Sequence, residues 1–151
     1  MTRRPPKRLK FYRDEDRRHP RLKDARITAG VAWGLTRQLI EALGLPQLPV
    51  VFLPVSRHHY YQYLPQCGHC HRRGWDDPKL RKVIAYSERR PKHPSRGIRV
   101  LDVVHEVAHY WQDLETDNTW HGPEMAKLVD LGCEVVRKLI VIHSAAARKK
   151  S

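Results

Sequence analysis

Residues 98–114 read IRVLDVVHEVAHYWQDL, and this stretch decides how the chain is organised. Its apolar residues recur three and four positions apart, which predicts a helix with a broad buried face. That face consists of Val100, Val103, Val104, Val107, Ala108 and Trp111. His105 and His109 lie four residues apart in the same stretch, so their imidazoles are expected one above the other on one side of the helix. We therefore expect a core helix that carries a histidine pair.

The histidine pair has the spacing needed to hold one metal ion. Glu106 follows His105 and is rotated from it by about 100° around the helix, which points its carboxylate beside such an ion. A zinc-bound water has a pKa near 7, and a neighbouring carboxylate can take its proton and pass it to a leaving group. This is the logic of the H-E-x-x-H motif, so we predict a zinc hydrolase with one catalytic Zn²⁺ and Glu106 as its base.

A catalytic zinc normally has three protein ligands and one open position. His121 is the preferred third ligand, because it lies in a predicted turn at a distance that lets the chain fold back. Glu134 is the alternative, with the spacing of the downstream glutamate in thermolysin-type enzymes. Glu124 lies in the first turn of a helix expected to begin at Pro123, where a carboxylate suits the helix dipole. We interpret Glu124 as a residue that orients a ligand.

Two segments together resemble the SprT/Spartan family of zinc metallopeptidases: HEVAHYW at residues 105–111 and, after a polar linker, HGPEM at residues 121–125. The similarity covers about residues 60–143 and, more loosely, residues 26–43. It implies a minimal zincin fold, zinc ligation by His105, His109 and His121, and Glu106 as the catalytic base. Spartan-type members cleave proteins crosslinked to DNA and are activated by DNA contacts, so the resemblance also implies a nucleic-acid partner.

The remaining pattern predicts an α+β fold, with a small sheet packed on an N-terminal helix, the helix of residues 98–114 and a C-terminal helix. In the first helix, Ile27, Val31, Leu35 and Leu39 recur every four residues, and Gly44 ends it. We expect the strand at 82–87 to be an edge that pairs with an extended substrate. This first helix spans residues 26–43. The other predicted elements are strands at 48–55 and 60–64 and loops at 67–74 and 88–97.

The chain has 151 residues and a net charge of +13, with a pI of about 10.1. We divide it into a flexible basic arm at 1–24, one metallopeptidase domain at 25–144 and a short basic tail at 145–151. So basic a protein is attracted to polyanions, which favours nucleic acid as a partner through salt-sensitive phosphate contacts. The candidate contact residues in the arm are Arg3, Arg4, Lys7, Arg8 and Lys10.

No run of eighteen apolar residues occurs, so we predict no membrane span and a cytoplasmic location. The three cysteines Cys67, Cys70 and Cys133 do not suggest a disulfide framework. Cys67 and Cys70 are a candidate second metal site if two nearby histidines join them, and the alternative is a pair of half-buried cysteines. Cys133 is expected in the core.

Two other functions fit the sequence. One is a non-catalytic, zinc-containing module that binds nucleic acid, in which the zinc would have a fourth protein ligand and Glu106 would have no role. The other is a different H-E-x-x-H hydrolase, such as a WLM or YgjP-like enzyme with another substrate. The Gly122-Pro123-Glu124 sequence after His121 favours the SprT/Spartan interpretation over the second alternative.

Overall fold

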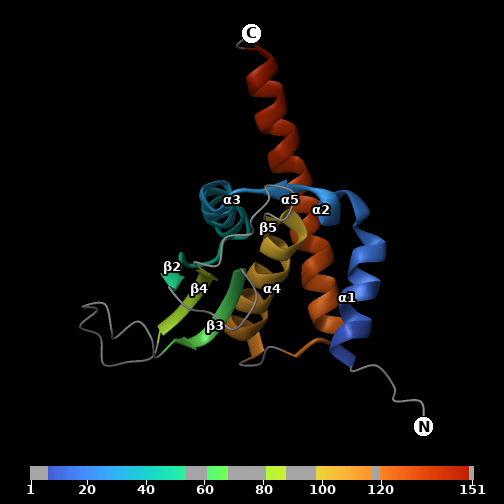
Figure 1. Cartoon of the computed structure of the whole chain (residues 1–151), viewed down its shortest axis with the longest axis vertical. Helices are drawn as coiled ribbons and strands as arrows, with labels where there is room; N and C mark the ends of the chain where they lie inside the picture. The colour runs from blue at the N-terminus through green and yellow to red at the C-terminus, as the bar shows by residue number, and fades with distance from the viewer. Residues whose placement is uncertain (1–6, 54–60, 68–80, 88–97, 117–119, 150–151) are drawn as a thin grey trace.

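The computed structural model describes residues 7–53, 61–67, 81–87, 98–116 and 120–149. Helices and a small sheet pack around one core, which confirms the α+β prediction (Figure 1). The elements in chain order are α1 (Lys7–Arg18), α2 (Pro20–Asp24), β1 (Arg26–Ile27), α3 (Ala29–Ala42), β2 (Val50–Leu53), β3 (Tyr61–Cys67), β4 (Arg81–Ser87), β5 (Ile98–Arg99), α4 (Val100–Thr116) and α5 (Pro123–Lys149).

The central helix is α4, which packs against α5, α3, α2 and β3. Its buried residues lie on every side, from Val100 to Asp113, as expected for a helix surrounded by other elements. The predicted start at Ile98 is two residues early, because Ile98 and Arg99 form β5. That short strand pairs antiparallel with β1, and the Val100 N–H donates to the Ala25 carbonyl at 2.9 Å. These bonds fasten the start of α4 to the segment that precedes α3.

The three-stranded sheet has the order β2-β4-β3, with β4 parallel to β2 and antiparallel to β3. Strand β2 lies at one edge of this sheet and β3 at the other. The edge position predicted for residues 82–87 is wrong, because β4 is the middle strand and has a partner on both sides. An extended substrate therefore cannot pair with β4 as an additional strand. The hypothesis that residues 82–87 pair with substrate is wrong for the same reason.

The first predicted helix is present as α3, but it begins at Ala29. The Thr28 side chain caps it by accepting a hydrogen bond from the Val31 N–H, and Gly44 follows its end with a φ of 71°, which glycine adopts without strain. The predicted stripe is partly wrong: Val31 is exposed, and the fully buried positions are Ala32, Thr36, Leu39 and Ile40. The face that contains Ala32 and Thr36, with shorter side chains than the predicted Val31 and Leu35, is the one buried in the core, where α3 contacts α4 and α5.

The structure corrects the predicted N-terminal arm. Residues 7–18 and 20–24 are not a flexible arm, because they form α1 and α2, and the side chains of Glu15, Leu22 and the intervening His19 are buried. Residues 145–149 continue α5 as helix, and the boundary predicted at residue 144 stays a prediction. Within the described part of the chain, no helix is both long enough and apolar enough to cross a membrane.

Close packing of α4 on α5 gives a first prediction. A Cβ added at Gly132 of α5 would lie 2.9 Å from Cγ1 of Val104, a buried side chain that is stiff in a helix. We expect Gly132→Ala to destabilise the protein, because overpacking costs about 1–3 kcal/mol and outweighs a gain of about 1 kcal/mol in helix propensity.

Gly34→Ala in α3 is the matched control, since nothing lies within 4 Å of the added Cβ there. It should raise the free energy of unfolding by about 0.5–1 kcal/mol, measured by denaturant unfolding. Equal stabilisation by both substitutions would contradict the close approach of the two helices.

Candidate metal centre

Helix α4 places the two motif histidines side by side, as the spacing predicts. The Nε2 atoms of His105 and His109 lie 3.0 Å apart, and both residues are buried. His121 completes the group from the other side: its Nε2 lies 3.2 Å from that of His105 and 3.1 Å from that of His109. These three side chains are the group of potential metal ligands found among the described residues.

The position of His121 depends on how the chain turns between α4 and α5. Gln112, on the last turns of α4, donates from Nε2 to the Trp120 carbonyl at 3.1 Å and so holds the residue before His121. Pro123 then starts α5, where the missing N–H of proline costs nothing. The sequence predicted this start correctly.

The three nitrogens fit a zinc ion. Ligands of a tetrahedral zinc with Zn–N bonds of about 2.0–2.1 Å lie about 3.3 Å from one another, close to the 3.0–3.2 Å observed. Without an ion, three neutral imidazoles would place the lone pairs of their Nε2 atoms against one another, with too few N–H groups to form hydrogen bonds between all of them. A cation between the rings removes that repulsion, so the donor set suits a metal that prefers imidazole nitrogen.

Glu106 lies beside this group without being part of it. Its Oε1 accepts a hydrogen bond of 2.8 Å from the backbone N–H of Tyr63 in β3, which fixes the carboxylate against the edge of the sheet. Burial raises the pKa of Glu106 to about 7, although His105 and the Tyr63 N–H both lower it. A carboxyl group with that pKa can take up and release a proton near neutral pH.

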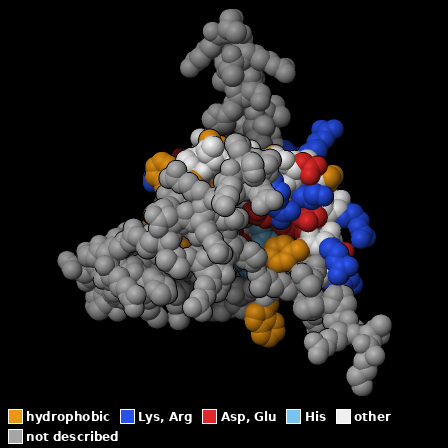
Figure 2. Space-filling view, in the orientation of Figure 1, with side chains coloured by type: hydrophobic (Ala, Val, Ile, Leu, Met, Phe, Trp, Pro, Cys, Tyr) orange, Lys and Arg blue, Asp and Glu red, His pale blue; other side chains and the backbone are white. Residues whose placement is uncertain are grey.

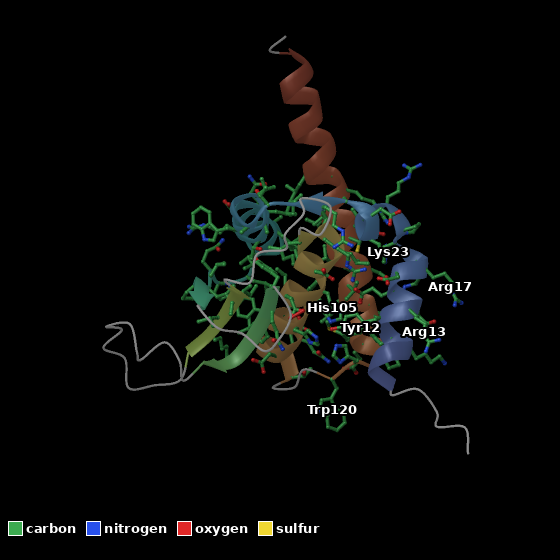
Figure 3. The ribbon with its side chains drawn as sticks, viewed as in Figure 1. Tyr12, Arg13, Arg17, Lys23, His105 and Trp120 are labelled. Atoms are coloured by element: carbon green, nitrogen blue, oxygen red, sulfur yellow. The ribbon has the colours of Figure 1, made fainter. Side chains whose placement is uncertain are left out.

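A second carboxylate contacts the group from behind, and the sequence analysis missed it. Glu15 of α1 is fully buried, and its Oε2 lies 2.7 Å from Nδ1 of His105. Burial lowers the pKa of His105, but the hydrogen bond to Glu15 and the nearby carboxylates raise it, and the net pKa lies above the usual value. Tyr12 stacks on the His105 ring at 4.7 Å between centroids (Figure 3).

A sequence signal for Glu15 existed. Phe11 and Glu15 lie four residues apart on α1, Leu22 lies on α2, and all three side chains turn toward the core. Because only some of these positions are aliphatic, an aliphatic stripe was the wrong pattern to search for in residues 7–24.

The other predicted site residues are not in the group of converging ligand atoms. Glu124 is exposed in the first turn of α5, and Glu134 is exposed further along it. Cys67 ends β3, whereas Cys70 lies outside the described residues, so the second metal site stays a prediction. Cys133 is in the core, as predicted.

Of the basic candidates, Arg3 and Arg4 lie outside the described residues, and Lys7 and Arg8 are in the first turn of α1. Lys10 is exposed on α1, as are Arg13 and Arg17, and Arg21 continues this set on α2. Figure 2 shows Lys and Arg side chains along the side of the molecule that these two helices form. We call Lys10, Arg13, Arg17 and Arg21 the basic face.

Comparisons of the chain with family models, curated proteins and solved structures find no match. The resemblance to SprT/Spartan peptidases therefore stays a prediction from the motif residues.

The ligand assignment predicts the metal content of the purified protein. Wild type should carry one zinc per chain, and His105→Ala, His109→Ala and His121→Ala should each lose most of it, measured by elemental analysis after dialysis. Glu134→Gln should keep one zinc, because Glu134 is exposed and does not belong to the ligand group. Loss of zinc in Glu134→Gln with retention in His121→Ala would contradict the assignment.

Proposed function

We propose that the chain is a zinc-dependent metallopeptidase with a minimal zincin-like fold, and that it cleaves DNA-bound or DNA-crosslinked proteins. The observation that carries the proposal is the combination of three converging histidines with a buried carboxylate next to them that is not a ligand. Three protein ligands leave one coordination position open, as in catalytic zinc sites. A purely structural site needs no carboxylate in the position of Glu106.

Zinc bound by His105, His109 and His121 would polarise a carbonyl and lower the pKa of water to about 7. The chain supplies the proton transfers. Since the Tyr63 N–H holds Oε1 of Glu106, the other oxygen, Oε2, is the one that accepts the proton of the attacking water and delivers it to the leaving amine. The low exposure of Glu106 and of both α4 histidines limits competing bulk water at this step.

Replacing Glu106 tests the enzymatic proposal. Glu106→Gln keeps the size of the side chain but cannot act as a base, so peptide cleavage should fall by about 10²–10⁴-fold while the zinc content stays at one per chain. The assay is proteolysis of an unstructured DNA-binding protein, with and without single-stranded DNA. Zinc in both variants with no cleavage under any condition would favour a binding module or a hydrolase with another substrate.

The basic face supports the nucleic-acid part of the proposal. Lys10, Arg13, Arg17 and Arg21 are exposed along the outer side of α1 and α2, and Figure 3 shows Arg13 and Arg17 projecting away from the core. Each contact to a duplex phosphate lowers the slope of log K against log salt by about 0.9.

Single substitutions on the basic face should therefore change the salt dependence of duplex DNA binding. We expect Arg13→Gln or Arg17→Gln to make the slope shallower by about 0.9. Arg37→Gln is the control: Arg37 is an exposed arginine on α3 whose guanidinium lies 5.1 Å from the centroid of the Trp33 ring. Titrations at several salt concentrations give the slopes. Equal slopes for all three variants would remove the basic face from the proposal.

A further inference from the structure

Glu15 has no role in the mechanism described above, yet it is among the most completely buried charged groups of the described residues. Burying a carboxylate is strongly unfavourable unless a cation or hydrogen bonds compensate it. Within the described part of the chain, the one ion-pair partner found for Glu15 is the ring of His105, and its second oxygen, Oε1, has no hydrogen-bond partner. Among the described residues, His105 is therefore the group that compensates the buried charge of Glu15.

An ionised carboxylate only accepts hydrogen bonds, so Nδ1 of His105 is the donor in this pair. The proton on Nδ1 leaves Nε2 with its lone pair, and Nε2 is the atom that lies 3.0 Å from His109 and 3.2 Å from His121. A carboxylate on the far nitrogen also makes the imidazole a stronger ligand. A cation at Nε2 would in turn compensate the buried negative charge of Glu15 through the His105 ring.

We propose that Glu15 is a positioning residue of the metal centre, which fixes the ring and tautomer of His105 and raises its affinity for zinc. This inference rests on the ligand set of the proposed function. It also makes α1 an integral part of the site, although α1 contributes no ligand.

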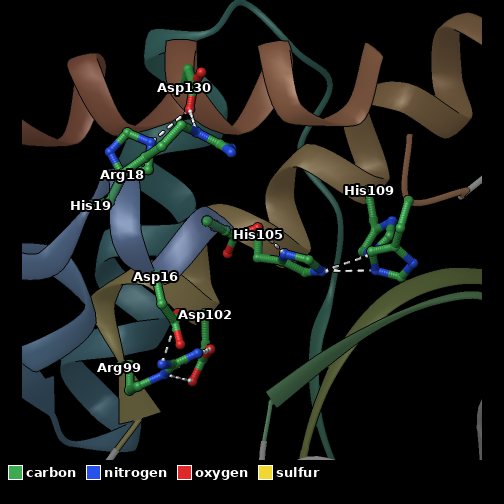
Figure 4. A network of polar contacts seen from close by, with 10 residues as sticks. Asp16, Arg18, His19, Arg99, Asp102, His105, His109 and Asp130 are labelled. Atoms are coloured by element: carbon green, nitrogen blue, oxygen red, sulfur yellow. Dashed lines mark hydrogen bonds and ion pairs between the residues drawn. The ribbon is translucent and has the colours of Figure 1, made fainter. Parts of the chain in front are cut away.

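The rest of α1 holds the carboxylate in register. Tyr12 stacks on His105, with ring planes 21° apart. The rings of Phe11 and His121 meet edge to face, with their centroids 5.1 Å apart. Beyond Glu15, Asp130 of α5 accepts hydrogen bonds from Arg18 at 3.1 Å and His19 at 2.6 Å (Figure 4).

On the other side of α1, Arg99 joins Asp16 to Asp102 of α4, with nitrogen–oxygen distances of 3.2 and 2.7 Å. The helix is thus tied to both α4 and α5, so that when one tie is lost the other still holds Glu15 beside His105.

The test measures zinc affinity of the full-length protein by competition with a chromogenic chelator. Glu15→Leu should bind zinc about 10- to 100-fold more weakly than wild type. Glu15→Gln should lose less, because its amide oxygen can still accept from Nδ1 although the charge is gone. Asp14→Asn, the same kind of change one residue earlier, should bind as wild type does.

A second variant separates positioning from folding. Asp130→Ala removes the contact that docks α1 on α5, so it should lower the free energy of unfolding while the folded protein keeps its zinc affinity. An equal loss of affinity in Asp130→Ala and Glu15→Leu would overturn the proposal, because Glu15 would then act only by docking α1.

The proton itself gives a readout that needs no zinc. The metal-free wild type should show a slowly exchanging Nδ1–H resonance of His105 by NMR, and Glu15→Leu should lose it. Wild-type zinc affinity in both Glu15 variants, or the same resonance in Glu15→Leu, would overturn the inference. Zinc affinity that depends on Glu15 in a protein without peptidase activity would leave this inference standing and remove the proposed function.

Discussion

Three imidazole nitrogens converge within 3.2 Å of one another, largely out of water, and the surrounding helices have to hold them there. Such a group is stable only if each ring is held by its neighbours and a cation is accommodated between the rings. Helix α4 supplies two rings at fixed separation, and the turn before α5 supplies the third. The central position of α4, covered by α3, α5 and β3, gives the rigidity that this arrangement needs.

Two carboxylates flank the histidines, and their surroundings suit the two different roles proposed for them. Glu106 faces β3, where a backbone N–H holds one oxygen and leaves the other for the proposed proton transfer. Glu15 faces the back of His105 and is closed off by α1, so it can orient a ring but cannot reach a substrate. Helix α4 thus carries the proposed base, Glu106, on one side and contacts the carboxylate of Glu15 on the other.

The sequence predicted the parts of the site that follow from local spacing. The helical repeat places His105, Glu106 and His109. The approach of His121 to them also depends on the Gln112–Trp120 hydrogen bond and on the packing of α4 against α5. Glu15 was missed because its partner lies ninety residues away and its helix carries few aliphatic residues.

Strand order was misjudged for a different reason. The continuous apolar run Val83-Ile84-Ala85 in β4 is typical of a strand covered on both faces, but residues 82–87 were interpreted as an edge. Pairing partners in a mixed sheet depend on contacts distant in the chain, which periodicity does not report. Val31 is exposed for a similar reason: which face of α3 is buried depends on its packing against α4, and that contact is distant in the chain.

The most direct test of the zinc site is an anomalous difference map at the zinc edge from crystals of the zinc-loaded protein. We expect one strong peak, bonded to Nε2 of His105, His109 and His121, with one coordination position free of protein and Glu15 still bonded to Nδ1 of His105. A peak with a fourth protein ligand would make the site structural. A map with no peak among these histidines would contradict zinc binding by His105, His109 and His121.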